Sequence, residues 1–163
     1  MEPLKHATLI FLVKKTKGKI TEICIAMKKR GFGVNKWNGV GGKVNSEIES
    51  IEDAAKREAK EEIDVGLIKF KKVAELFFYF PYKPEWNQIV HTYFCTKWTG
   101  SPKESEEMNP KWVSIKKIPY KEMWPDDAYW LPIILKGKIV NAKFTFGENE
   151  IIQNKEIDIV NEL

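Results

Sequence analysis

Apolar and polar positions follow two different periods along the chain, and the change of period predicts both strands and helices. The run from Ala7 to Lys14 is almost wholly apolar, which is typical of a strand buried on both faces. From Thr21 to Lys28 apolar and polar residues alternate, as they do in a half-covered strand. Between 51 and 63 small and aliphatic residues recur three or four positions apart, which predicts an amphipathic helix. Ser50 is a suitable N-cap for this helix.

The second half of the chain is richer in strand-like segments. A second helix is predicted from about Asp126 to Leu135, with Pro132 as a point where it could kink or end. The predicted strands are Val73–Phe80, Ile89–Thr99, a shorter Lys111–Ile115, Ala142–Phe146 and Ile151–Val160. Strands outnumber helices and the helices interrupt them irregularly. We therefore predict an α+β (mixed α/β) fold around one curved sheet, as a single domain over residues 1–163.

Composition narrows the classes of protein and of partner. The chain has 163 residues, of which 43% are hydrophobic and 31% charged, so neither disorder nor a membrane protein is expected. The first residues do not resemble a signal peptide, and Cys24 and Cys95 lie far apart without a metal-binding spacing, which favours a cytoplasmic protein with reduced cysteines. The net charge is +4, and the basic residues form only short clusters along the chain. We expect no nucleic-acid partner and no membrane partner, and we expect a monomer.

The candidate chemistry lies in a glycine-rich segment and the helix that follows it. Residues 29–44 contain five glycines, which excludes a helix and favours close approach of backbone to a ligand. In the helix, the spacing places Glu58, Glu61 and Glu62 on one face. Like charges at this spacing destabilise a helix, whereas convergent carboxylates are what Mg²⁺ or Mn²⁺ requires. The alternative is a solvated acidic face balanced by the neighbouring basic residues.

The residues from Gly42 to the end of this helix resemble the Nudix box, G-x5-E-x7-R-E-U-x-E-E-x-G-U. The segment from Glu49 through 57–62 fits the pattern in spacing. One extra residue separates Gly42 from Glu49, and Asp64 stands where the pattern has its last glycine. The extra residue affects the expected loop geometry, whereas Asp64 can still end a helix in a left-handed conformation. The box spans about residues 42–65.

Three further segments resemble the eukaryotic MutT homologues, a family of oxidised-purine nucleoside triphosphatases. They are Met27–Gly33, Trp37–Val44 and Met123–Trp130, in the same order as in the family. The resemblance implies the Nudix fold, an α/β/α sandwich around a curved mixed sheet. It also implies Mg²⁺-dependent hydrolysis of oxidised purine (deoxy)nucleoside triphosphates, such as 8-oxo-dGTP and 2-hydroxy-dATP, to the monophosphate and pyrophosphate. That reaction would sanitise the nucleotide pool.

The resemblance also assigns metal-binding and catalytic residues. The expected metal is Mg²⁺, with Mn²⁺ as an alternative. Its expected ligands are Gly41 (backbone carbonyl), Glu58, Glu61, Glu62 and Glu107. Either Glu61 or Glu62 would be the general base that activates water, and the sequence leaves both open because clustered carboxylates titrate together. Arg57 is expected to orient a glutamate by ion pairing.

Residues that line the nucleotide site are implied in the same way. They are Thr8, Lys28, Asn38, Val40, Gly41, Gly42, Lys43, Phe78, Trp124, Pro125, Asp126 and Asp127. The indole would stack on a purine, the amide would read its edge, and the adjacent acids would share a proton that suits more than one oxidised base. Other interpretations remain: the acids could only stabilise a helix N-terminus, Lys28 could end a strand, and Phe78 could belong to the core.

Two other functions fit parts of the sequence. One is a Nudix hydrolase of a different nucleotide, either a methylated purine triphosphate or a nucleoside diphosphate derivative. The other is a non-catalytic nucleotide-binding module, which a degenerate box would favour. The three helix glutamates and Arg57 are all present, so the sequence favours an enzyme.

Overall fold

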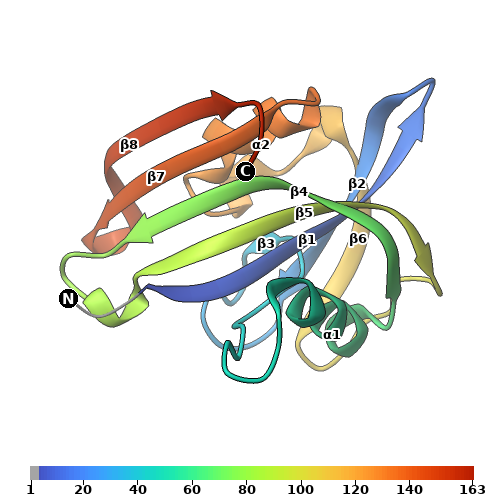
Figure 1. The fold of residues 1–163 in the computed structure, drawn as a ribbon, viewed down its shortest axis with the longest axis horizontal. Helices are drawn as coiled ribbons and strands as arrows, with labels where there is room; N and C mark the ends of the chain where they lie inside the picture. Colours follow the sequence, from blue (N-terminus) through green and yellow to red (C-terminus); the bar gives the residue numbers. More distant parts are fainter. Residues whose placement is uncertain (1–3) are drawn as a thin grey trace.

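A curved mixed sheet forms the centre of the computed structural model, which describes residues 4–163 (Figure 1). Within that range the sheet has eight strands, in the order β3-β2-β1-β5-β4-β7-β8, with β6 paired to β2. The strands are β1 (Lys5–Thr16), β2 (Lys19–Lys28), β3 (Trp37–Asn38), β4 (Gly66–Tyr79), β5 (Gln88–Thr99), β6 (Met108–Ser114), β7 (Ile139–Gly147) and β8 (Ile151–Val160). The pairs β1–β5 and β4–β7 are parallel and the others antiparallel. The first residues, on which the expected lack of a signal peptide partly depends, lie outside the described range.

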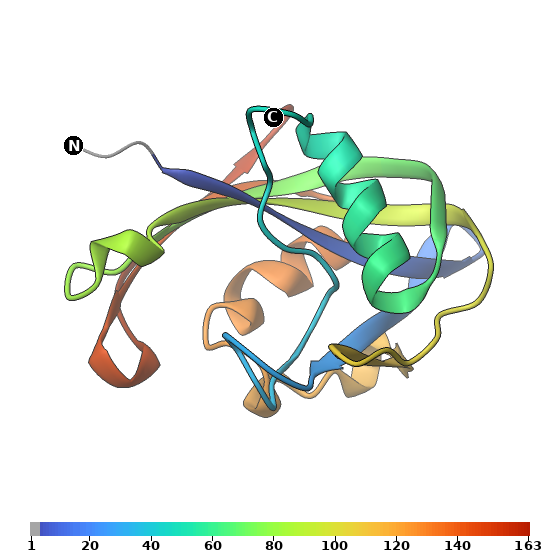
Figure 2. The same ribbon diagram turned by 90° about the horizontal axis from the view of Figure 1, so that it is seen from below.

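Two α-helices pack on opposite faces of this sheet. They are α1 (Ile51–Ile63) and α2 (Asp127–Leu135), which lie apart in Figure 2. Alternate side chains of β1 serve both faces: Leu9 and Phe11 join the core cluster that contains α2, and Ile10 and Leu12 join the cluster that contains α1. The predicted α/β/α sandwich is therefore confirmed. Four short 3-10 turns complete the described chain: Pro84–Trp86, Ile115–Lys117, Tyr120–Glu122 and Glu148–Glu150.

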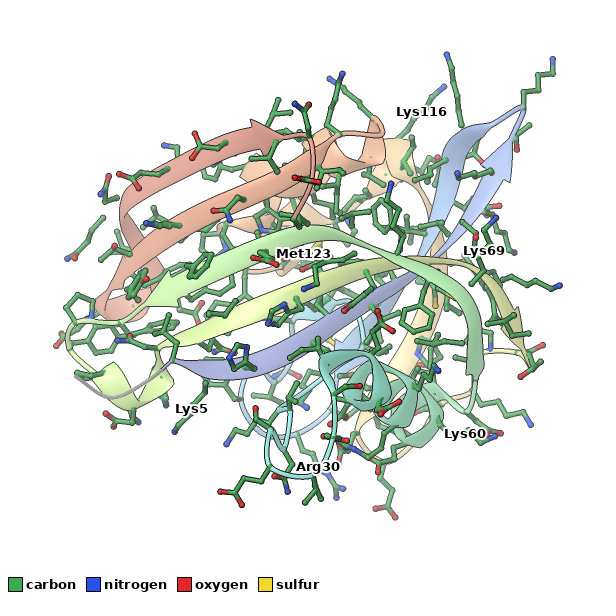
Figure 3. All side chains as sticks on the ribbon, in the orientation of Figure 1. Lys5, Arg30, Lys60, Lys69, Lys116 and Met123 are labelled. Carbon is green, nitrogen blue, oxygen red and sulfur yellow. The ribbon has the colours of Figure 1, made fainter. Side chains whose placement is uncertain are left out.

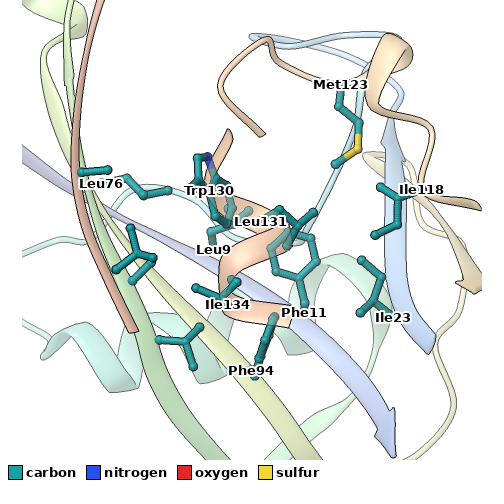
Figure 4. Packing of buried hydrophobic residues seen from close by; sticks show 14 of the residues in the cluster. Leu9, Phe11, Ile23, Leu76, Phe94, Ile118, Met123, Trp130, Leu131 and Ile134 are labelled. Atoms are coloured by element: carbon teal, nitrogen blue, oxygen red, sulfur yellow. The ribbon is translucent and has the colours of Figure 1, made fainter. Parts of the chain in front are cut away.

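The core on the α2 side is built around Trp130. Its side chain is fully buried and packs near Leu131, Phe11 and Leu76 (Figure 4). Pro132 lies inside α2 without ending the helix. Burial of side chains on both sides of the proline offsets the loss of the one backbone hydrogen bond that the ring removes.

Helix α1 has the boundaries that its sequence predicts, because both ends carry local capping signals. The Ser50 side chain accepts a hydrogen bond from the Asp53 backbone N–H at 3.1 Å. Asp64 ends the helix in a left-handed conformation, with φ of 56°. Thus the acidic residue that replaces the last glycine of the box performs the same backbone task.

The strands differ from the prediction where their pattern is irregular. Strand β4 begins at Gly66, seven residues before the predicted Val73. The prediction missed its first half because register shifts and exposed lysines interrupt the alternation of apolar and polar residues there. Strand β6 begins at Met108 rather than Lys111 and contains Pro110, which is tolerated because β6 pairs only with β2. The two-residue β3 was not predicted.

Charged side chains cover the outside of the sandwich. Lys5, Arg30, Lys60, Lys69 and Lys116 are exposed and extend away from the ribbon (Figure 3). The basic surplus is therefore spread over several elements rather than gathered into one patch. No helix in residues 4–163 has the length and apolar character needed to cross a membrane.

One polar cluster lies buried in the sheet. In β5, the Nε2 atom of His91 lies 2.9 Å from Nδ1 of His6. The Nδ1 atom of His91 lies 2.8 Å from Nζ of Lys72. Because an ammonium only donates, Nδ1 of His91 must accept, and Nε2 carries the proton that is donated to His6. Burial, Lys72 and His6 together lower the pKa of His91 to about 4. His91 is therefore neutral in the folded protein at physiological pH.

This cluster makes stability depend on pH. A histidine whose folded pKa is lowered stabilises the fold above its unfolded pKa, and that stabilisation is lost as pH falls from about 6.5 toward 4. His91→Gln keeps a donor and an acceptor but takes up no proton. Between pH 7 and pH 4.5 we expect its free energy of unfolding to fall by less than that of the wild type. The difference should be roughly 1–3 kcal/mol in urea titrations. Equal losses in the two proteins would exclude His91 as the site of proton uptake.

Candidate active site

A cavity of about 740 Å³ lies beside β1 and β2 and gathers residues from across the chain. Of the residues that the sequence implicates, it is lined by Thr8, Lys28, Asn38, Gly41, Gly42, Lys43, Glu58, Glu62, Phe78, Glu107, Trp124, Asp126 and Asp127. Four others do not line it within the described chain: Val40, Arg57, Glu61 and Pro125. The predicted site is thus largely brought together, and three of the four exceptions, Val40, Arg57 and Glu61, have identifiable causes.

Arg57 organises the carboxylates at the helix and the loop before it. Its Nε and Nη2 bind Glu49 at 3.0 and 2.7 Å, and its Nη1 binds Glu58 at 2.9 Å and Glu61 at 3.2 Å. It also donates to the Lys43 backbone carbonyl at 3.1 Å. The guanidinium lowers the pKa of Glu49 to about 2. In the described chain Arg57 therefore binds these carboxylates and the loop backbone and does not line the cavity.

The glycine pair 41–42 lets the loop lie directly on β1. The Thr8 backbone N–H donates to the Gly42 carbonyl at 2.9 Å, and Ile10 and Val40 exchange hydrogen bonds at 2.6 and 3.0 Å. A Cβ on Gly41 would lie 2.0 Å from the Thr8 carbonyl oxygen. A Cβ on Gly42 would lie 2.7 Å from Glu58 Oε1. Only glycine allows the backbone to come this close to both the strand and the carboxylate. Val40, which is buried, fixes this loop through its backbone.

Glu62 is the most unusual acid of the helix. It is only 2% exposed. Its Oε1 accepts from the Gly41 backbone N–H at 3.3 Å, and its Oε2 has no hydrogen-bond partner within residues 4–163. Burial, and then the neighbouring Glu58, raise its pKa to about 8. A buried oxygen without a partner is costly and is consistent with a site for a cation or a proton.

The remaining predicted metal ligands differ in position. Glu107 lines the cavity, with its carboxylate 4.0 Å from Lys28 Nζ and 3.4 Å from Arg30 Nη2. Glu61 is largely exposed and turns to Arg57 instead. In the described residues, no three His, Cys, Asp or Glu side chains form a ready cluster for a metal. The physical reason is that carboxylates repel one another and each is attracted to the nearest cation, here Arg57, Lys28 or Arg30.

The adjacent acids Asp126 and Asp127 are both almost fully buried in the cavity wall. Asp126 accepts a hydrogen bond from Trp130 Nε1 at 2.7 Å, and Asp127 Oδ2 is without a partner in the described chain. Burial raises the pKa of Asp126 to about 6 and that of Asp127 well above its usual value. Burial therefore favours the protonated form of both acids.

The alternative role for this pair is to stabilise the N-terminus of α2 by charge. Asp126 is the N-cap residue and Asp127 lies in the first turn, where the helix dipole favours an acid. In the described structure the Asp126 side chain makes no capping hydrogen bond and is turned toward Trp130. Burial of both acids in a cavity wall is in addition a feature of ligand sites.

Aromatic side chains around the cavity form a closed ring that the sequence did not reveal. Consecutive centroid distances run 5.1 Å from Phe32 to Trp124, 6.3 Å to Phe146, 5.4 Å to Phe80, 5.6 Å to Trp86 and 5.0 Å back to Phe32. All five line the cavity. Only Trp124 was predicted. The aromatic spacing of the strands was a usable signal for Phe80 and Phe146, but nothing local distinguishes Trp86.

Three other predicted residues serve two purposes. Thr8 Oγ1 is 3.4 Å from both the carbonyl oxygen and the N–H of Gly42, so it supports the loop as well as lining the cavity. Phe78 lines the cavity and stacks on Phe144 of the core, with centroids 5.8 Å apart. Asn38 lines the cavity while its Oδ1 accepts from the Gly39 N–H at 2.9 Å, which leaves its amide NH₂ as a free donor among the described residues.

Comparison with known proteins agrees with this geometry. Two proteins named oxidized purine nucleoside triphosphate hydrolase are similar in sequence. The one from Mus musculus is 42% identical over 139 residues, which is 83% of this chain and 88% of that protein. The one from Danio rerio is 38% identical over 159 residues, which is 98% of this chain and 97% of that protein.

Solved structures show the same fold. A MutT protein from Bacillus halodurans superposes with a TM-score of 0.80 at 19% identity, covering 95% of this chain and 98% of its own. A MutT Nudix hydrolase from Burkholderia pseudomallei superposes with a TM-score of 0.62 at 20% identity, covering 72% and 88%. The model of the NUDIX domain family matches residues 3–133, most of the chain. The chain therefore belongs to the Nudix hydrolase family.

Proposed function

We propose that this protein hydrolyses oxidised purine (deoxy)nucleoside triphosphates, such as 8-oxo-dGTP and 2-hydroxy-dATP, to the monophosphate and pyrophosphate, and so sanitises the nucleotide pool. The observation that carries the proposal is the coexistence, in one cavity, of box carboxylates and a buried acid pair beside an aromatic wall. The box carboxylates suit a metal-bound phosphate chain, and the acid pair with the aromatic wall suits a purine. The names and high coverage of the mouse and zebrafish relatives support the same reaction.

The residues present fit a divalent cation, for which Mg²⁺ is proposed and Mn²⁺ is the alternative. The unpartnered buried oxygen of Glu62 and the hard oxygen donors beside it are suitable ligands. Glu58, Glu62, Glu107 and the Gly41 carbonyl would hold the metal, with Glu61 joining them if it turns away from Arg57. When bound, the metal would neutralise phosphate charge and make a coordinated water more acidic.

The protein's own groups would then orient and deprotonate water. Glu62, which lines the cavity, is the proposed proton acceptor, and exposed Glu61 is the alternative. Arg57 keeps Glu58 directed at the cavity by pairing with it at 2.9 Å. Lys28, which lines the cavity beside Glu107, is placed to contact a phosphate or a ribose.

Recognition of the base would depend on Trp124 and the two acids. The indole offers a stacking face to a purine. The acid that holds the proton donates a hydrogen bond, and the ionised acid accepts one. Because the proton can reside on either Asp126 or Asp127, the pair can match edges of oxidised guanine and of oxidised adenine.

We further propose that the protein acts as a cytoplasmic monomer. Both cysteines are free and buried, and burial raises the pKa of the Cys24 thiol to about 11. Such thiols are inert and fit a reducing compartment.

A substrate panel tests the reaction directly. With Mg²⁺ present, pyrophosphate release from 8-oxo-dGTP and 2-hydroxy-dATP should exceed that from dGTP and dATP by an order of magnitude or more in kcat/KM. Methylated purine triphosphates and a nucleoside diphosphate sugar test the other Nudix reactions. Equal rates on oxidised and normal purines would overturn the proposal.

The metal site is tested by Glu62→Gln. Removing the proton acceptor and one ligand should lower kcat by roughly 10²–10⁴-fold. The matched control is Glu156→Gln, an exposed acid on β8. Circular dichroism and melting temperature verify folding. A Glu62→Gln protein that keeps activity within twofold of the wild type would remove Glu62 from the mechanism.

The acid pair is tested by Asp126→Asn and Asp127→Asn. An amide cannot exchange the shared proton, so each change should raise KM for an oxidised purine by roughly 10-fold or more and affect kcat less. In the wild type, ionisation of Asp126 as pH rises through about 6 should produce an inflection in KM, which Asp126→Asn should abolish. An unchanged preference between oxidised and normal purines in both variants would contradict this role.

A further inference from the structure

Lys36 joins three segments that are distant in sequence at the edge of the cavity. It lies in the loop between β2 and β3 and lines the cavity. Its Nζ is 2.9 Å from Glu150 Oε2, in the turn between β7 and β8. The same Nζ is 5.2 Å from the centroid of the Trp124 ring, just before α2. The ammonium thus contacts both an acid and the proposed stacking platform.

The backbone on both sides of this ion pair is held in a defined shape. In the loop, Lys36 N–H donates to the Gly33 carbonyl at 3.1 Å, and Lys28 N–H donates to the Lys36 carbonyl at 3.1 Å. In the turn, Asn149 and Glu150 both adopt left-handed conformations, with φ of 62° and 60°. Two successive non-glycine residues in the left-handed conformation cost free energy, which indicates that the surrounding structure constrains this turn.

The loop that carries Lys36 packs against the indole. Phe32 stacks on Trp124 with an interplanar angle of 27°, although 52% of its side chain is exposed. A Cβ on Gly33 would lie 3.4 Å from Trp124 Nε1, so the backbone here is in near contact with the ring. Phe32 also contacts Trp86, with centroids 5.0 Å apart, but an exposed aromatic on a glycine-flanked loop is held more firmly by a further contact elsewhere in the loop. The Lys36–Glu150 pair supplies one.

We propose that Lys36 is a positioning residue for base recognition: its ion pair with Glu150 holds the Phe32–Lys36 segment against Trp124. This rests on the proposed function, because it takes Trp124 to be the platform for the purine. The first half of the same loop, through Lys29 and Arg30, contacts the acidic residues 104–107 instead. Loss of the Lys36 pair should therefore weaken substrate binding and leave the hydrolytic step little changed.

The test compares Lys36→Met, Glu150→Gln and the double variant. Each single variant should raise KM for an oxidised purine triphosphate by roughly two- to fivefold, the range expected for a partly exposed ion pair with a cation–π contact, with kcat within twofold of the wild type. Because both changes break one interaction, the double variant should be no worse than the more impaired single variant. Lys36→Arg should restore the wild-type KM.

The matched control is Lys155→Met. Lys155 also lies over an aromatic ring, 4.6 Å from the Tyr129 centroid, but does not line the cavity, so its KM should not change. An unchanged KM in both single variants, additive effects in the double variant, or an equal effect of Lys155→Met would overturn the proposal.

A second measurement does not depend on activity. Hydrogen exchange of the ligand-free protein should show faster exchange of amides 32–36 in Lys36→Met and in Glu150→Gln, and unchanged exchange in Lys155→Met. If the wild type does not hydrolyse oxidised purines, the proposed function fails while this measurement still decides whether the pair restrains the loop. Unaltered exchange in both variants would overturn the restraint itself.

Discussion

The binding of three carboxylates by the single guanidinium of Arg57 is the interaction on which the acidic part of the site depends. Glu49, Glu58 and Glu61 would otherwise repel one another at the surface of one helix and its preceding loop. Arg57 also reaches the Lys43 carbonyl, so it fixes the loop and the helix relative to each other. The extra residue between Gly42 and Glu49 is accommodated within this arrangement, since Glu49 still reaches Arg57 through both oxygens. Arg57 does not pair with Glu62, which lies buried in the cavity wall with a raised pKa.

The other acidic pair is stabilised by the core rather than by a cation. Asp126 accepts from Trp130, and Trp130 is the largest fully buried side chain of the cluster that joins α2 to the sheet. Asp126 is thus tied to the packing of the fold, whereas Glu49, Glu58 and Glu61 are tied to a polar network. Burial raises the pKa of both Asp126 and Asp127, and the hydrogen bond from Trp130 offsets this only in part for Asp126. The tendency of this pair to hold a proton thus follows from its burial.

Local patterns predicted the parts of the molecule whose causes are local. Helix α1 was predicted to the residue because Ser50, Asp64 and the small-residue stripe all act within a few positions. The parts set by distant contacts were not predictable. Register shifts interrupt the sequence pattern in the first half of β4, and Trp86 contacts Phe32 only because the sheet brings their loops together. Glu61 has the spacing of a cavity-facing ligand, but a neighbouring arginine, four residues away, draws it outward. Sequence spacing thus identifies which side chains share a helix face, and the charges around them decide where each one points.

The segment between β2 and β3 connects the two kinds of chemistry. Lys28, Lys29 and Arg30 reach the acidic loop that presents Glu107, and a few residues later Phe32, Gly33 and Lys36 lie against Trp124. Glycines 31 and 33 adopt positive φ angles, which allows the chain to reverse between these two sets of contacts. Backbone hydrogen bonds at the base of the loop, from Lys28 N–H to the Lys36 carbonyl and from Asn35 N–H to the Lys28 carbonyl, hold its two halves in place. The loop therefore makes two separate sets of contacts, one with the acidic residues 104–107 and one with Trp124, and Lys36 belongs to the second set.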